Sequence, residues 1–169
     1  GNAMCTRCYN TCFYIRSNGG GMLVDAGGGN GIFRQLHKAH ITYEEIRHIF
    51  VTHVHTDHIL GVVWLIRKIS PLIHKGKHPG KLFIYCNSEV KHALETICRL
   101  LIPRKINRAI GESIILQEVH DGEQLMVDDM NMTCFDLGTT KTMQYGFRLL
   151  MPDGQSVVCL GDEPFYQRN

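Results

Sequence analysis

The sequence has no excess of charge of either sign and no long apolar run. Its 169 residues carry 18 lysines and arginines against 16 aspartates and glutamates, which gives a formal net charge of +2. So small a charge gives no argument for a nucleic-acid or membrane-surface partner, and no run of like charges marks an interaction tail. The longest apolar stretch, residues 59–66, is far shorter than the roughly 20 residues that span a bilayer. We therefore expect no membrane partner.

Several motifs of well-known enzyme classes are also missing. No Gly-x-Ser-x-Gly elbow is present, so nothing indicates a serine-nucleophile hydrolase. The glycine-rich segment 27–31 fits neither the dinucleotide nor the P-loop spacing, and we expect it to form a turn. No repeat, low-complexity segment or linker interrupts the chain. With 44% apolar and 20% charged residues, the composition predicts one globular domain over residues 1–169.

The seven cysteines do not suggest a disulfide framework. They are an odd number, scattered and mostly within apolar segments: Cys5, Cys8, Cys12, Cys86, Cys98, Cys134 and Cys159. This pattern favours reduced core thiols, so we expect a cytoplasmic protein. Cys5-x-x-Cys8 could be half of a zinc or redox motif, but no second cysteine pair accompanies it.

Apolar periodicity and turn residues predict a chain of mixed strands and helices. A hairpin is expected from residues 11–15 and 22–25, and Thr42 to Glu45 has the pattern of a capping box before a short helical turn. Pro71 is expected to stop a core helix over 59–69, and Ser88 to cap a helix that Pro103 ends. Further strands are expected at 47–51, 82–85, 113–119, 124–127, 132–137, 144–150 and 157–160, and a helix at 32–38. The fold class is α/β, with mixed sheets covered by helices.

The densest chemistry lies in Val51-Thr52-His53-Val54-His55-Thr56-Asp57-His58, between a predicted strand and a predicted helix. Ligands and reaction centres of α/β proteins collect in such loops. Residues two apart in extended backbone point to one side, so His53 and His55 can converge on one ion. Asp57 and His58 are adjacent and must diverge, which suits a second ion. Imidazole and carboxylate donors favour zinc, with iron, manganese or cobalt as alternatives.

A polar loop whose histidines are unrelated, some of them capping the next helix, is the simpler alternative. Ten histidines in the chain make some clustering expected by chance. Four potential ligands at alternating spacing between two apolar elements favour a metal site over that alternative.

The pattern His53-x-His55-x-Asp57-His58 resembles the signature of the metallo-β-lactamase-fold hydrolases, in the ribonuclease Z-like, phosphodiesterase-type branch. Three further segments resemble that family in the same order: Met22 to Gly27, Tyr145 to Arg148, and Val158 to Asp162. The resemblance covers nearly the whole chain and implies an αββα sandwich. It also implies that the first strand and the C-terminal part of the sandwich are absent from this sequence.

The resemblance implies a metal site and a hydrolytic reaction. The implied ligands are His53, His55, Asp57, His58 and Asp162, with Asp162 bridging two metals. They would hold one or two Zn²⁺ ions, or Mn²⁺ or Fe. Metal-activated water would then attack a phosphodiester or other small anionic substrate, with RNA also possible. Asp57 is the expected catalytic residue, and Asp25 is expected to support the metal loop through hydrogen bonds. A homodimer is possible.

The sequence departs from the family pattern at two places. The family brings a further histidine from the loop before the Tyr145 strand, and the matching position here is Gly138, which has no side chain. His120 is a weak candidate to replace it. The family also uses a last histidine beyond the Gly-Asp motif, and none lies between Asp162 and Asn169. The alternative to an enzyme is therefore a catalytically impaired metal-binding or interaction module of the same fold. Lys141 and Arg148 could contact an anionic substrate or lie on the surface.

Overall fold

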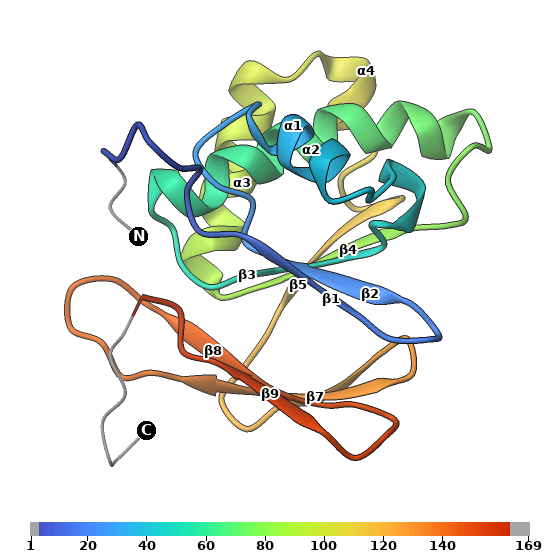
Figure 1. Ribbon diagram of the computed structural model, residues 1–169. Coiled ribbons are helices and arrows are strands. Elements are labelled where there is room, and N and C mark those ends of the chain that lie inside the picture. The colour runs from blue at the N-terminus through green and yellow to red at the C-terminus, as the bar shows by residue number, and fades with distance from the viewer. Residues whose placement is uncertain (1–3, 163–169) are drawn as a thin grey trace.

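The computed structural model describes residues 4–162 and shows two sheets packed face to face (Figure 1). The first sheet has the order β1-β2-β3-β4-β5, in which β1 is antiparallel to β2 and the other pairs are parallel. The second is antiparallel, in the order β6-β7-β8-β9. Helices α1 to α4 lie on the outer face of the first sheet. The described residues therefore form three layers, one helical and two of sheet.

The predicted elements occur in the expected order, and the structure adds one short helix, α4, that was not predicted. The first sheet and its helices comprise β1 (Phe13–Arg16), β2 (Gly21–Val24), α1 (Ile32–Lys38), a 3₁₀ turn (Tyr43–Glu45), β3 (His48–Val51), α2 (Thr56–His74), β4 (Leu82–Cys86), α3 (Ser88–Leu101), α4 (Arg104–Asn107) and β5 (Ile114–Glu118). The second sheet comprises β6 (Gln124–Val127), β7 (Met130–Asp136), β8 (Tyr145–Leu150) and β9 (Ser156–Cys159). The hairpin and the Thr42 capping box are confirmed, the latter by Thr42 N donating to the Glu45 carboxylate at 2.7 Å.

Two predictions about helix ends were wrong. Pro71 does not stop α2, which continues to His74. Proline removes only one backbone hydrogen bond, and Ile69 and Ile73 continue the apolar stripe that holds the helix to the sheet. The cap of α3 is Asn87 and not Ser88, because the Asn87 side chain accepts from Val90 N at 3.0 Å.

Strand alternation divides the core in two. Leu23, Ile49 and Val51 face the helices, whereas Met22, Val24 and Phe50 face the second sheet. Phe50 meets Phe147 of β8 there, with ring centroids 4.9 Å apart. Two fully buried layers therefore fix the strand ends that carry the histidine loop. Among residues 4–162, no helix combines the length and the hydropathy needed to cross a bilayer.

A close approach between α2 and the loop after β2 fixes the start of that helix. Gly61 N donates to Gly27 O at 2.8 Å, and Ala26 N donates to His58 O at 3.0 Å. A Cβ added at Gly61 would lie 1.8 Å from Ala26 O. The loop and the helix can approach this closely only because residue 61 has no side chain.

We expect Gly61→Ala to lower the free energy of unfolding by about 3 kcal/mol, because the methyl group must push the loop off the helix. Alanine is the better helix former by about 1 kcal/mol, so helix propensity alone predicts the opposite sign. Urea unfolding measures the difference. Gly29→Ala is the control, since a Cβ there has nothing within 4 Å. Equal stability of the two variants would contradict the close approach.

Candidate metal centre

The histidine loop lies where β3 ends and α2 begins, at the carboxyl edge of the parallel strands. His53 follows β3 by two residues, His55 is the residue just before α2, and His58 lies in the first turn of that helix. The His55 side chain makes no capping hydrogen bond. His55 therefore occupies the N-cap position of α2 through its backbone, and its imidazole does not act as the cap.

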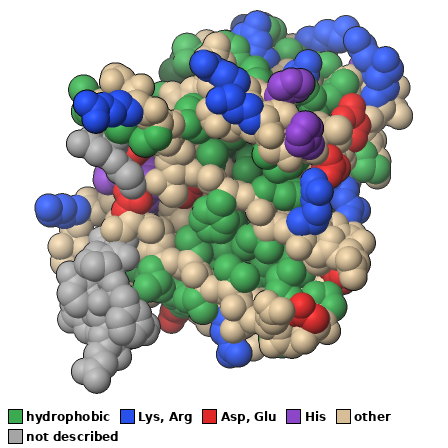
Figure 2. Space-filling view, viewed as in Figure 1, with side chains coloured by type: hydrophobic (Ala, Val, Ile, Leu, Met, Phe, Trp, Pro, Cys, Tyr) green, Lys and Arg blue, Asp and Glu red, His purple; other side chains and the backbone are tan. Residues whose placement is uncertain are grey.

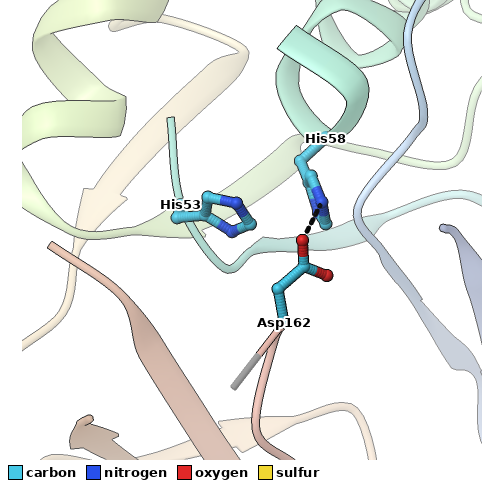
Figure 3. Close-up of side chains that lie close together, drawn as sticks. All are labelled: His53, His58 and Asp162. Atoms are coloured by element: carbon cyan, nitrogen blue, oxygen red, sulfur yellow. Dashed lines mark ion pairs between the residues drawn. The ribbon is translucent and has the colours of Figure 1, made fainter. Parts of the chain in front are cut away.

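Three side chains converge on one point between the two sheets. Each of His53, His58 and Asp162 offers a ligand atom, and these atoms all lie within 4.8 Å of one another (Figure 3). The two imidazole rings are fully buried and their centroids are 4.1 Å apart. Asp162 follows β9 and reaches the histidines from the second sheet. Residues more than 100 positions apart in the sequence thus form one cluster.

His55 and Asp57 border this cluster. His55 Nδ1 lies 2.9 Å from His53 Nε2, and Asp57 Oδ2 lies 3.7 Å from His58 Nε2. The alternation of extended backbone predicts that His53 and His55 approach each other. It does not predict that His58 also lies against His53, because α2 begins at Thr56 and turns His58 back toward the strand end.

The Asp25 carboxylate organises the two buried histidines. Asp25 Oδ1 accepts from Thr52 N at 2.9 Å, and Oδ2 lies 2.9 Å from Thr52 Oγ1 and 2.7 Å from His58 Nδ1. A carboxylate only accepts, so the Thr52 hydroxyl must donate to Asp25. Thr52 Oγ1 can then only accept from His53 Nδ1, which lies 2.9 Å away. Both imidazoles therefore carry a proton on Nδ1, so His53 Nε2 can accept from His55 Nδ1, while His58 Nε2 has no hydrogen-bond partner in the part of the chain that the structure describes.

Sequence reasoning missed Thr52. A single threonine before a histidine has no pattern that singles it out. Its role arises from the parallel pairing of β2 with β3, in which Val24 lies opposite Phe50. The side chain of the next residue, Asp25, therefore reaches Thr52, the first residue after β3. Only the register of the two strands could have identified it.

The cluster fits a cation. Within the described residues, the buried His58 Nε2 has no hydrogen-bond partner, although Asp162 Oδ2 lies 3.3 Å away. A buried polar atom without a partner destabilises the fold by about 1–3 kcal/mol unless something else binds it. Imidazole nitrogens and carboxylate oxygens are the donors that zinc takes in proteins.

The charges around the two histidines differ. Burial, and next the neighbouring His58, lower the pKa of His53 to about 4. Burial also acts to lower the pKa of His58, but the hydrogen bond to Asp25 and the charges of Asp25, Asp162 and Asp57 outweigh it and raise that pKa. The carboxylates that favour a proton on His58 also favour a metal cation beside it.

The low pKa of His53 predicts a pH dependence of stability for the metal-free protein. Between about pH 6.5 and pH 4 the unfolded chain takes up a proton at this residue and the folded chain does not. The free energy of unfolding therefore falls as the pH drops through this window, by up to about 3 kcal/mol. Urea unfolding at several pH values with chelator present measures the slope. His53→Asn should reduce this slope, and an unchanged slope would contradict the assignment of the pH dependence to His53.

The position matched to the further histidine, its weak replacement and the two candidate anion contacts add no ligand to the described group. Gly138 has φ +62°, a left-handed conformation in which a histidine would be strained. His120 is exposed in the turn after β5, and it does not belong to the described group that could share a cation with His53. Arg148 alternates with the buried Phe147 and Leu149, so its side chain lies on the outer face of the second sheet. Lys141 is exposed.

A family model described as "Anti-Pycsar protein Apyc1" matches residues 1–168. The chain is also similar to ribonuclease Z of Streptomyces coelicolor, with 26% identity over 149 residues, and to that of Phocaeicola vulgatus, with 27% identity over 108 residues. These matches cover 86% and 62% of this chain but only 45% and 31% of the two relatives. The chain thus spans less than half the length of these curated relatives.

Solved structures share the fold. The metallo-β-lactamase fold protein YhfI from Bacillus subtilis superposes with a TM-score of 0.71 at 16% identity, over 97% of this chain and 60% of that one. The short form of human tRNase Z gives a TM-score of 0.63 at 21% identity, over 90% and 62%. The predicted fold class is therefore confirmed, and the two sheets are those of a metallo-β-lactamase-like fold.

Proposed function

Because the chain belongs to the family of the anti-Pycsar protein Apyc1, we propose that it is a metal-dependent phosphodiesterase that hydrolyses a cyclic nucleotide. The observation that carries the proposal is the convergence of His53, His58 and Asp162 at a point between the two sheets. The ribonuclease Z relatives support the same reacting bond, since a ribonuclease cleaves a phosphodiester.

The proposed metal ligands are His53, His55, Asp57, His58 and Asp162. They would hold one or two divalent cations, for which zinc suits the donor set and manganese or iron are alternatives. When bound, the metal supplies a Lewis acid that activates water at neutral pH and neutralises charge on the phosphoryl oxygens. The other ligand positions, including the one that Gly138 leaves without a side chain, would be open to water or substrate.

The protein's own residues prepare this site in two ways. Asp25 and Thr52 hold the Nδ1 atoms of His58 and His53, which leaves the Nε2 atoms of both rings as the possible metal ligands. Asp57 is buried, with its carboxylate 3.7 Å from His58 Nε2, and would accept a proton at this carboxylate and return it to the leaving group.

The test is hydrolysis by the zinc- or manganese-loaded protein of three substrates: cyclic mononucleotides, bis(p-nitrophenyl) phosphate and an RNA with a 3′ extension. We expect cyclic-nucleotide turnover that a chelator removes and added metal restores. His92→Ala is the control, because this histidine is exposed on α3.

The other outcomes identify the alternatives. Cleavage of the RNA without turnover of cyclic nucleotides would replace the proposed substrate by RNA. Tight metal binding without turnover of any substrate would indicate the impaired metal-binding module, which the missing side chain at Gly138 favours.

A further inference from the structure

Two thiols lie together in the segment before β1, outside the candidate metal centre. Cys5 Sγ and Cys8 Sγ are 3.4 Å apart, and either could donate a hydrogen bond to the other. Cys8 is exposed and Cys5 is partly exposed. We propose that Cys5 and Cys8 are a redox-active dithiol that forms a reversible disulfide. This disulfide would stiffen the following residues, which contact the glycine loop (residues 26–31) beside the histidines. This inference is independent of the proposed phosphodiesterase activity.

The geometry needs little change for the bond to form. A disulfide joins its sulfur atoms at about 2.05 Å, so the two sulfurs must approach by roughly 1.4 Å. Both cysteines lie in a turn at the surface, in which no helix or sheet pairing has to break. An ordinary packed pair of core thiols would not have this freedom or this access to solvent.

The two thiols also differ in the way that thiol exchange requires. The backbone N–H groups of Cys8 and then Arg7 lower the pKa of Cys5, whereas the hydrogen bond to Cys5 raises the pKa of Cys8. Cys5 is therefore the attacking thiolate and Cys8 the resolving thiol. Burial raises the pKa values of the remaining cysteines to about 11 or 12, which leaves them unreactive: Cys12, Cys86, Cys98, Cys134 and Cys159.

The oxidant is a low-molecular-weight disulfide such as oxidised glutathione. The Cys5 thiolate attacks one of its sulfurs, forms a mixed disulfide and releases one thiolate. Cys8 then loses its proton and attacks Cys5 Sγ, which forms the intramolecular disulfide and releases the second thiolate. The two protein thiols lose two electrons and two protons, and the oxidant is reduced to two thiols. An excess of reduced thiol reverses both steps.

The residues directly after Cys8 connect this pair to the glycine loop. The Tyr9 hydroxyl lies 2.9 Å from Ala26 O and 2.8 Å from Gly29 O, and Gly28 N donates to Asn10 Oδ1 at 3.1 Å. A Cβ built at Gly28 would be 3.7 Å from Asp57 Cα, so the loop rests against the metal loop. A disulfide between residues 5 and 8 would restrict the chain at the position just before Tyr9.

The test uses the full chain, equilibrated in glutathione buffers from strongly reducing to strongly oxidising, then quenched, alkylated and digested with trypsin. Cleavage after Arg7 and Arg16 separates Cys5 from Cys8 unless a disulfide joins the fragments 1–7 and 8–16. Fragmentation of the joined peptides distinguishes Cys8 from Cys12. We expect a Cys5–Cys8 link that reduced glutathione removes, and slower amide exchange in residues 26–31 of the oxidised protein.

Matched variants decide the result. Cys5→Ser and Cys8→Ser should lose the link and the change in exchange, while Cys12→Ser should keep both. Separate alkylated fragments at the most oxidising ratio, glutathione adducts without a link, or a link through Cys12 would overturn the proposed site. A Cys5–Cys8 link with unchanged exchange in residues 26–31 would overturn the coupling to the glycine loop.

Discussion

His58→Ala is expected to lower phosphodiesterase turnover roughly a thousand-fold or more and to abolish tight metal retention. The Nε2 atom of this residue is buried among carboxylates that belong to different elements, 3.3 Å from Asp162 and 3.7 Å from Asp57. Removing the imidazole takes away the neutral ligand that would share a cation with the carboxylates of Asp57 and Asp162, and leaves these two negative charges near each other. Metal content after gel filtration and the turnover rate measure the two effects.

The same substitution also removes the partner of the buried Asp25. Thermal unfolding must therefore accompany the assay, and turnover should be compared at a temperature where the variant remains folded. His92→Ala, which also replaces a helical histidine, should behave as the unmodified protein. An alanine variant at His58 that keeps its metal and its turnover would show that the cluster is not the reactive site.

Asp25→Asn is expected to weaken metal affinity about 10- to 100-fold and to lower the free energy of unfolding by about 1–3 kcal/mol. The two Thr52 groups and His58 Nδ1 all donate to this carboxylate. An amide presents one oxygen and one NH₂ group, so at least one buried donor faces another donor. The backbone is not the cause, because φ is +52° at Asp25 and asparagine tolerates this conformation.

Asp128→Asn is the matched control for this effect. Asp128 also has a left-handed backbone (φ +54°) and also pairs with a buried histidine, His48 Nε2 at 3.1 Å. It lies in the turn between β6 and β7 and not at the metal loop. Its substitution should lower stability without changing metal affinity, measured by competition with a chelating dye. Equal loss of affinity in both variants would mean that general destabilisation, and not ring orientation, controls binding.

Local sequence signals gave the position of the candidate site but not its internal arrangement. The apolar segment before His53 and the apolar helix after His58 placed the loop at a strand end, because burial patterns are local. The sequence predicted that Asp25 would form hydrogen bonds to the histidine loop, but not which groups it contacts, since these depend on the register of two parallel strands whose paired residues are 26 positions apart. The approach of Asp162 followed only from the family resemblance.

The errors in element bounds have similar causes. Pro71 was expected to end α2 because proline lacks an amide, yet the apolar stripe beyond it keeps the helix on the sheet. Ser88 and Asn87 are both good caps, and the choice between them is made by tertiary structure. Asn87 Nδ2 donates to Met143 O at 2.9 Å, a contact with the loop before β8 that no local pattern encodes.

His53 and His58 belong to the first sheet and its helix, whereas Asp162 extends from the second sheet. A divalent ion shared by them would act as a removable cross-link between the two halves of the sandwich. Because the ion would bind all three ligands only when the two sheets are packed together, it would stabilise the packed state. The stabilisation would be about 2.7 kcal/mol at a free ion concentration one hundred times the dissociation constant. Metal supply would then regulate how often the halves separate, as well as whether the chemistry can proceed.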